Sequence, residues 1–295
     1  MHSFGGGSDG AQPLTAGLVN MNGTLYGTTS CGGAYGNSAC FSGGSGGTGG
    51  TFFSVTTGGA ETVLYSFGSG SDGSIPTAGL VDVGGTLYGT TQAGGIYGKG
   101  TVFSINTKGT EKVLHSFGNG SDGSDANASL VVVKGVLYGM TARGGTKNRG
   151  TVFSISTSGM EQILYRFRKV PDGSVPEASL VYAKGKLYGT TVYGGSKEPK
   201  SDPYCCGVVF SLTMAGKEKV LHSFGKGSGD GWDPVAGLID VKGKLYGTTI
   251  NGGKYTQGDT LGGTVFSISL TGTESVLHSF SGGSDGYNPN ASLSM

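Results

Sequence analysis

The sequence predicts an all-β fold, a five-bladed β-propeller built from four-stranded antiparallel blades. Five copies of a unit of roughly 50 residues follow one another along the chain, and each copy contains four short strand-like segments without helical periodicity. Glycine makes up 62 of the 295 residues, which suits the many tight turns between short strands. A propeller of six blades, one of them incomplete, is the alternative.

Three markers define the repeat and recur in the same order. The pentapeptide Leu-Tyr-Gly-Thr-Thr, with one Met variant, starts at Leu25, Leu87, Leu137, Leu187 and Leu245. A segment of the type Gly-Thr-Val-Phe-Ser follows it, and each copy ends on a phenylalanine, at Phe67, Phe117, Phe167, Phe224 and Phe280. The copies span about residues 16–67, 78–117, 128–167, 178–224 and 236–280, with terminal stubs at 1–15 and 281–295. We expect one domain over residues 1–295.

The second copy shows how each element is predicted. Residues 78–83 and 86–91 are strand-like and are joined by Gly84-Gly85, a hairpin signal. Residues 101–107 alternate as a strand does, Lys108-Gly109 marks a turn, and residues 111–117 form the fourth strand. Because one such unit cannot bury both of its faces, neighbouring units must stack.

These motifs resemble the GloVer-type (Gloeo/Verruco) tandem repeat of bacterial proteins. The shared motifs are Ser-Asp-Gly-x-x-Pro-x-Ala-x-Leu, Leu-Tyr-Gly-Thr-Thr-x-x-Gly-Gly, Gly-Thr-Val-Phe-Ser and the closing Leu-His-Ser-Phe, and they cover almost the whole chain. The resemblance implies a propeller-like repeat and an extracellular or cell-surface location, and it implies no particular activity. The first residues show no signal peptide.

The copies differ in the loop between their second and third strands. From the last Thr of the second strand to the Phe of the third, the five intervals are 24, 12, 12, 19 and 17 residues, so copies 1, 4 and 5 carry insertions. In a closed ring of five, these copies would be neighbours and their loops would form a crescent on one face. Binding residues concentrate on loops that a rigid scaffold holds.

The crescent supplies the candidate ligand-binding residues, which combine aromatic rings with carboxylates. They are Tyr35, Tyr193, Asp202, Tyr204, Trp232, Asp233, Tyr255 and Asp259. Rings of this kind stack on sugars, and carboxylates accept hydrogen bonds from hydroxyl groups. The alternative is that the Tyr and Trp side chains only pin glycine-rich loops.

All four cysteines lie in the insertions. Cys31 and Cys40 could close a local disulfide, and Cys205 and Cys206 could form a vicinal disulfide or bridge elsewhere. Zinc is the competing interpretation, but the spacing fits no common pattern of zinc ligands.

Histidine and aspartate recur at fixed positions of the repeat. His2, His115, His222 and His278 share a position with Tyr65 and Tyr165, which predicts a half-buried packing role. Aspartate precedes glycine in every connection between copies, at Asp9, Asp72, Asp122, Asp172, Asp230 and Asp285. An Asx-turn explains this pattern, and calcium is the alternative. We otherwise expect no cofactor and no metal site.

These features favour a non-catalytic recognition propeller that binds a glycan or a surface protein. One alternative is a glycoside hydrolase or lyase that uses Asp202, Asp233 and Asp259, and another is a structural or adhesin segment. A net charge of +1 with scattered Lys and Arg argues against nucleic acid, and the chain has no apolar run long enough for a membrane span. Residues 2–18 and 278–293 duplicate the same part of the repeat, so the surplus copy could pair with another chain.

Overall fold

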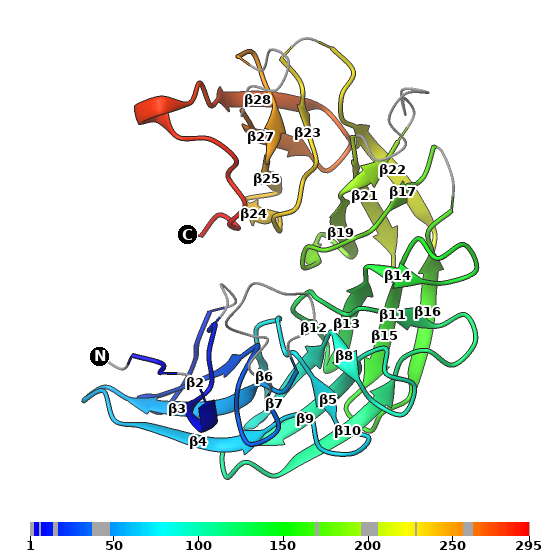
Figure 1. Cartoon of the computed structure of the whole chain (residues 1–295). Helices are drawn as coiled ribbons and strands as arrows, with labels where there is room; N and C mark the ends of the chain where they lie inside the picture. The colour runs from blue at the N-terminus through cyan, green and yellow to red at the C-terminus, as the bar shows by residue number, and fades with distance from the viewer. Residues whose placement is uncertain are drawn as a thin grey trace. The chain divides into compact units, whose positions relative to one another are not determined.

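The computed structural model describes residues 3–5, 7–13, 17–36, 48–168, 171–195, 206–227, 229–255 and 262–294. These residues form an all-β structure of repeated four-stranded antiparallel sheets, as the sequence predicts (Figure 1). The helical turns among them are the short 3-10 helices η1 (Gly7–Asp9) and η3 (Gly283–Asp285). No helix in this part of the chain is long and apolar enough to cross a membrane.

Each four-stranded sheet is one copy of the repeat, and we call it a blade. Blade 1 consists of β1 (Val19–Met21), β2 (Thr24–Thr29), β3 (Thr51–Thr56) and β4 (Glu61–Ser66). Blade 2 consists of β6 (Val81–Val83), β7 (Thr86–Thr91), β9 (Thr101–Asn106) and β10 (Glu111–Ser116). Blade 3 consists of β12 (Val131–Val133), β13 (Val136–Thr141), β15 (Thr151–Ser156) and β16 (Glu161–Arg166).

The last two blades have the same order. Blade 4 consists of β18 (Val181–Ala183), β19 (Lys186–Thr191), β21 (Val208–Thr213) and β22 (Glu218–Ser223). Blade 5 consists of β24 (Ile239–Val241), β25 (Lys244–Thr249), β27 (Thr264–Ser269) and β28 (Glu274–Ser279). The fold class predicted from the sequence is therefore confirmed, while closure of a ring at five blades stays a prediction.

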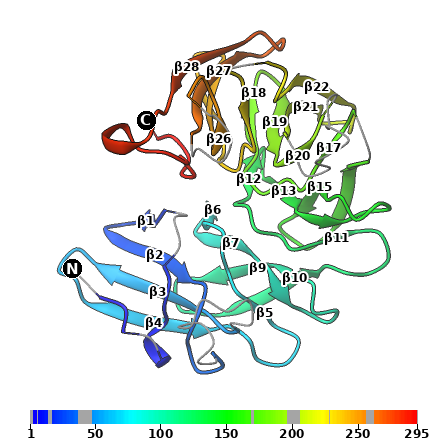
Figure 2. The ribbon, with the colours of Figure 1, turned by 45° about the horizontal axis from the view of Figure 1, so that its top comes forward.

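The chain divides into two compact units. Unit 1 holds Met1–Gly139 and Ser154–Gln162, and unit 2 holds Met140–Phe153 and Ile163–Met295, so the division passes through blade 3. Figure 2 shows blade 1 and blade 2 of unit 1, and blade 4 and blade 5 of unit 2, from a second side.

Short strands in the segments that connect successive blades add small sheets that the sequence analysis missed. In these sheets β5 (Gly73–Ser74) pairs with β8 (Ala93–Gly94), β17 (Gly173–Ser174) with β20 (Tyr193–Gly194), and β23 (Gly231–Trp232) with β26 (Asn251–Gly252). The corresponding strands around blade 3 are β11 (Gly123–Ser124) and β14 (Arg143–Gly144). Each connection is thereby fixed to the loop that follows the second strand of the next blade.

The repeated Leu-Tyr-Gly-Thr-Thr motif is explained by packing inside each blade. A Cβ atom at Gly89 of β7 would lie 2.7 Å from Cζ of Phe103 and 3.0 Å from Cδ2 of Leu80, so this position has room only for glycine. The last threonine of the motif bonds across the sheet, because Thr91 Oγ1 lies 2.9 Å from Thr101 Oγ1 and accepts a hydrogen bond from the Thr101 N–H at 3.0 Å. Both threonines are fully buried, so this pair satisfies polar groups that water cannot reach.

Aromatic rings join neighbouring blades within each unit. The phenylalanine that ends one copy packs on the third strand of the next blade, with ring centroids 4.9 Å apart for Phe67 and Phe103 in unit 1. Phe224 and Phe266 make the equivalent contact in unit 2, at 5.1 Å. In unit 1 the turn between β9 and β10 also packs against blade 1, because Gly109 of this turn lies against the backbone of Leu64 in β4.

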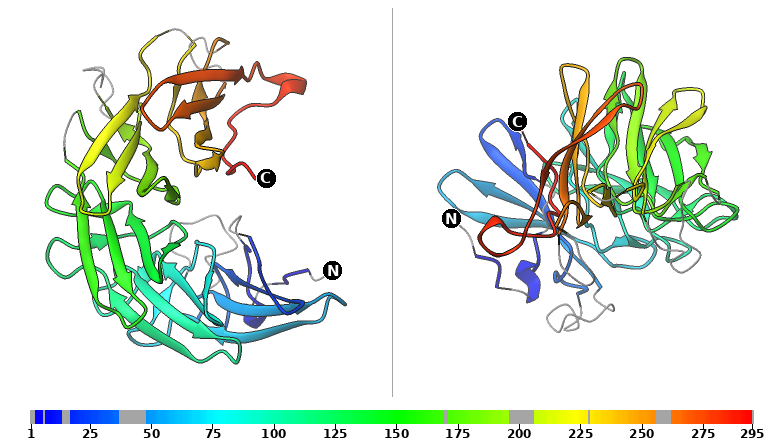
Figure 3. Two further views of the ribbon diagram at one scale, coloured as in Figure 1. Left: turned by 180° about the vertical axis from the view of Figure 1, so that it is seen from behind. Right: turned by 90° about the horizontal axis from the view of Figure 1, so that it is seen from above.

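Both terminal stubs make the contacts that a neighbouring blade makes elsewhere. Phe4 packs on Phe53 at 4.8 Å, in the same way as Phe67 packs on Phe103. The C-terminal segment returns toward β24 (Figures 1 and 3), where Ser292 Oγ accepts a hydrogen bond from the Gly237 N–H at 2.9 Å. The surplus copy of the repeat therefore packs on this chain's own blades in both units.

Candidate functional site

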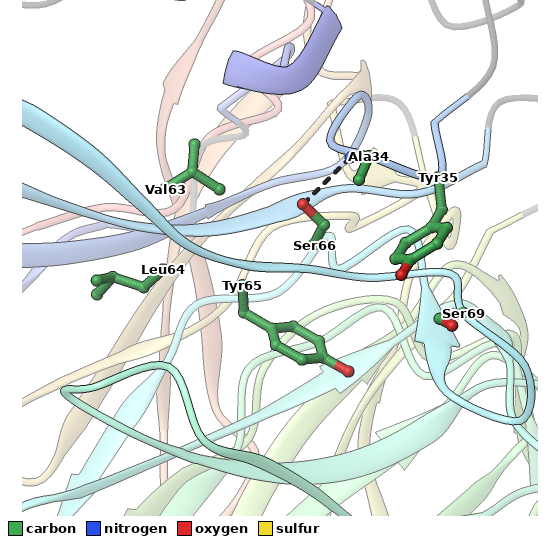
Figure 4. Close-up of a pocket in the computed structure, with 7 residues that line it drawn as sticks. All are labelled: Ala34, Tyr35, Val63, Leu64, Tyr65, Ser66 and Ser69. Atoms are coloured by element: carbon green, nitrogen blue, oxygen red, sulfur yellow. Dashed lines mark hydrogen bonds between the residues drawn. The ribbon is translucent and has the colours of Figure 1, made fainter.

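Blade 1 carries a pocket of about 470 Å³ (Figure 4). Ala34 and Tyr35 reach it from the enlarged loop after β2, and Ser69 comes from the connection that follows blade 1. The rest of the lining is one stretch of β4, residues Val63, Leu64, Tyr65 and Ser66. A hydrogen bond from the Ala34 N–H to Ser66 Oγ, 3.2 Å long, ties the loop to the strand.

Tyr35 and Tyr65 give the pocket its chemistry. Tyr35 is 52% exposed, so much of its ring surface is available to a ligand. Tyr65 is half-buried, and its hydroxyl donates to Asp72 Oδ2 at 3.0 Å. Burial, followed by the negative charge of Asp72, raises the pKa of the Tyr65 phenol, which therefore stays a neutral donor at physiological pH. Among the residues that the structure describes, the lining combines aromatic faces with hydroxyl groups and has no charged side chain.

Tyr35 occupies a repeat position that two further blades also fill with tyrosine. Tyr97 of blade 2 and Tyr255 of blade 5 follow the same Gly-Gly pair and are each 47% exposed. The residue before each tyrosine donates its backbone N–H to the last serine of the fourth strand, at 3.2–3.3 Å for Ile96 and Lys254. Tyr97 was not among the predicted binding residues because its loop is not enlarged, but it shares the pattern Gly-Gly-x-Tyr with Tyr35 and Tyr255.

A second recurring arrangement joins the histidine or tyrosine of each fourth strand to the aspartate of the next connection. Tyr65 and Tyr165 donate their hydroxyl hydrogens to Asp72 and Asp172, at 3.0 and 2.9 Å. His115 Nε2 lies 3.1 Å from Asp122 Oδ2, and its ring packs edge-on against Phe117. These contacts explain why histidine and tyrosine interchange at this position: either one presents a donor to the same carboxylate.

The aspartates themselves accept backbone hydrogen bonds in the turns. Asp72 accepts from the N–H groups of Gly68 and Gly73, at 3.2 and 2.6 Å. Asp285 accepts from the Ser281 N–H at 2.9 Å. This geometry supports the turn-stabilising role, and calcium at these aspartates stays untested.

A glutamate from the next blade faces each of three such pairs. Glu111 at the start of β10 lies near Asp72, Glu218 of β22 near Asp172, and Glu274 of β28 near Asp230 and His222. Burial is the main cause that raises the pKa of Glu111 and of Glu218 to about 7, and the neighbouring aspartate raises it further. The three ligand atoms of His222, Asp230 and Glu274 all lie within 4.8 Å of one another. These glutamates were not among the predicted site residues, although each one begins the fourth-strand segment of its repeat.

Comparison with known proteins agrees with the repeat pattern. The model of a family described as the Gloeobacter/Verrucomicrobia repeat matches residues 1–200. The chain belongs to this family. The resemblance drawn from the sequence is thus confirmed, and no curated protein matches the Gloeobacter/Verrucomicrobia repeat chain.

Several solved structures share weak similarity with this repeat protein. A gluconolactonase of Xanthomonas campestris, XC5397, is 13% identical with a TM-score of 0.46 over 77% of this chain and 67% of that one. A luciferin-regenerating enzyme is 11% identical with a TM-score of 0.46 over 92% and 76%. A GH43 β-1,3-galactosidase, BT0265, is 11% identical with a TM-score of 0.45 over 90% and 58%.

The residues expected in a crescent are only partly described by the structure. Trp232 is half-buried in β23 and packs against the core of blades 4 and 5, which supports the pinning role. Asp233 follows it at φ +56°, and its Oδ2 accepts from Asn251 Nδ2 at 3.0 Å. Tyr193 lies in β20 opposite Ser174. Asp202, Tyr204 and Asp259 lie outside the described residues.

Two cysteines are described, and both are buried. Cys31 pairs with Ala11 of the N-terminal stub through backbone hydrogen bonds of 2.8 and 3.2 Å. Cys206 is 2% exposed and forms a bridge with Gly194. Cys40 and Cys205 lie outside the described residues, so the predicted disulfides stay predictions.

Proposed function

We propose that this repeat protein is a non-catalytic recognition protein that binds a glycan in the pocket of blade 1. The observation that supports the proposal is the exposed ring of Tyr35, which lines a pocket of about 470 Å³ together with Tyr65, Ser66 and Ser69. A pocket of this volume suits a ligand of one or two sugar rings. The tyrosine face would stack on the CH groups of a sugar, and the hydroxyl groups would bond its oxygen atoms.

No carboxyl group lines the pocket among the residues that the structure describes, which favours binding over catalysis. Glycosidases work with two carboxyl groups that flank the scissile bond. Asp72 is the nearest carboxylate along the connection, but it is held by Tyr65, Gly68 and Gly73 and does not line the pocket. Glu111 faces Asp72 from blade 2, and the same pairing of Glu218 with Asp172 in unit 2 indicates a repeated structural role.

An exported location belongs to this proposal as well, whereas the crescent of enlarged loops is the competing location of the binding site. The family resemblance and the placement of every cysteine in an enlarged loop support export to an oxidising compartment. The crescent hypothesis assigns binding to Tyr193, Trp232, Asp233 and Tyr255 and to the undescribed Asp202, Tyr204 and Asp259, so it makes a different prediction for mutants of unit 2.

A glycan array followed by calorimetry with the strongest ligand tests the proposal. We expect Tyr35→Ala to weaken binding about tenfold or more, because it removes the stacking ring. Tyr97→Ala is the matched control, since it removes an equally exposed ring at the same repeat position, and it should leave the affinity unchanged.

Two results would overturn the blade 1 site. One is an array without any bound glycan, and the other is full affinity in Tyr35→Ala. Loss of binding in Trp232→Ala with an unchanged melting temperature would instead favour the crescent. We expect the opposite for Trp232→Ala, lower stability with normal affinity, because this ring packs on the core.

A further inference from the structure

We propose that His222, Asp230 and Glu274 form a binding site for a divalent transition-metal cation of the zinc class between blade 4 and blade 5. The three residues come from β22, from the connection between the blades and from β28. One ligand atom of each residue lies within 4.8 Å of the other two, a spacing at which a single ion can contact all three. This site is independent of the glycan pocket, which lies in unit 1.

The connection at this site differs from the other connections by one residue. Asp230 follows His222 by eight positions. In the other connections the aspartate follows the histidine or tyrosine by seven positions, as Asp72 follows Tyr65. Asp230 Oδ2 still accepts the N–H of the residue four positions earlier, Lys226, at 2.9 Å. His222 Nε2 stands 3.4 Å from Asp230 Oδ1, without the hydrogen bond that His115 makes to Asp122 at 3.1 Å.

Three polar atoms at this site are buried without a hydrogen bond. His222 Nε2, Asp230 Oδ1 and Glu274 Oε1 each expose less than 1 Å² and have no hydrogen-bond partner among the described residues. The His222 and Asp230 side chains are only 14% and 12% exposed. Buried polar atoms normally have partners, because leaving one without a partner destabilises the fold. A cation bound by all three atoms would satisfy them together.

The donor set indicates which cation would bind. An imidazole nitrogen with two carboxylate oxygens suits zinc, whereas calcium and magnesium prefer oxygen ligands in larger number. Two carboxylates offset the charge of a divalent ion, and in the part of the chain that the structure describes neither one forms an ion pair with lysine or arginine. Phe224 packs edge-on against His222 at 4.8 Å and holds the imidazole in place.

The neighbouring copy of the arrangement shows how the site can be removed without damage to the fold. Between blades 3 and 4 the equivalent residues are Tyr165, Asp172 and Glu218, and the tyrosine hydroxyl satisfies the aspartate at 2.9 Å. His222→Tyr would therefore reproduce a residue that the repeat already accepts at this position, while it deletes the nitrogen ligand.

The experiment is calorimetric titration of the chelator-treated full chain with zinc chloride, with cobalt(II) absorption as a second readout. We expect one site of micromolar or tighter affinity, tetrahedral cobalt bands, and an affinity at least a hundredfold lower in His222→Tyr and in Glu274→Gln. His115→Tyr is the matched control and should bind zinc as the unmodified chain does. Equal melting temperatures of His222→Tyr and the unmodified chain in chelator would show that the fold is intact.

The outcomes separate the metal site from its alternatives. Absence of zinc binding would overturn the proposal and leave His222 and Asp230 as an ordinary ion pair. Zinc binding that persists in His222→Tyr and in Glu274→Gln would overturn it as well, because the ion would then sit elsewhere on the chain. Glycan binding should be the same with and without chelator, so failure of this proposal and failure of the glycan proposal are distinguishable.

Discussion

Replacement of Glu111 by glutamine should change how the stability of the protein depends on pH. Glu111 is half-buried between blade 1 and blade 2 beside Asp72, and its pKa rises from an ordinary value of 4.5 to about 7. Between pH 4.5 and about pH 7, the Glu111 carboxyl group therefore stays protonated in the folded state but is ionised in the unfolded chain. Stability from Glu111 is fully present below about pH 4.5, decreases as the pH rises toward 7, and stays low above pH 7.

The size of the effect follows from the pKa rise. A rise from 4.5 to about 7 corresponds to about 3 kcal/mol of unfolding free energy. Glu111 is only partly buried, and solvent screening reduces the expected effect to about 1–2 kcal/mol. Glutamine has almost the same shape, stays neutral at every pH and can donate to Asp72, so the variant should avoid the loss at high pH.

Thermal unfolding of the two proteins from pH 4.5 to pH 8 measures this difference. We expect equal melting temperatures near pH 4.5 and a melting temperature about 2–4 °C higher for Glu111→Gln at pH 8. Lys112→Gln, a neighbouring exposed residue, controls for a general effect of charge and should show no such divergence. Parallel pH profiles for Glu111→Gln and the unmodified chain would refute the reasoning, because Glu111 would then titrate alike in both states.

Two further predictions test the packing of blade 2. Gly89→Ala places a Cβ atom 2.7 Å from the ring of Phe103 and should lower the free energy of unfolding, measured in urea, by about 1–3 kcal/mol. Gly58→Ala lies in an open turn and should change the free energy of unfolding little. Equal effects of the two substitutions would contradict the packing argument. Thr91→Val removes the hydroxyl that accepts from the Thr101 N–H and donates to Ala93, and should cost about 1–3 kcal/mol. Thr101→Val should cost less, because blade 4 carries valine at the equivalent position, and a larger cost for Thr101→Val would refute this ranking.

Much of each blade could be predicted from the repeat. Residues 86–91 were expected as the second strand and form β7, and Gly84-Gly85 closes the hairpin with both φ angles positive, at 61° and 88°. Strand pattern and turn chemistry act over a few residues, so a sequence shows them directly. The glycine of Leu-Tyr-Gly-Thr-Thr was recognised as a constant feature, but its cause, the Phe103 ring, became visible only in the structure.

The candidate sites were much less accessible to sequence reasoning. Loops that differ from the regular repeat were predicted to carry the binding residues. This prediction named Tyr35, which lines the blade 1 pocket, and also Trp232, which packs on the core of blades 4 and 5. It treated the recurring histidines and aspartates as separate structural features. In the structure they meet, and at His222 and Asp230 a single extra residue in the connection changes how they meet.

The sequence by itself determined the strands, the turns and the order of the blades, because these depend on residues close together in the chain. Only the tertiary structure decided which polar groups share a buried space. Glu274 lies 52 positions after His222, and Glu111 lies 39 positions after Asp72. The stacking of one blade on the next brings such residues together, and burial then raises the pKa of the glutamates.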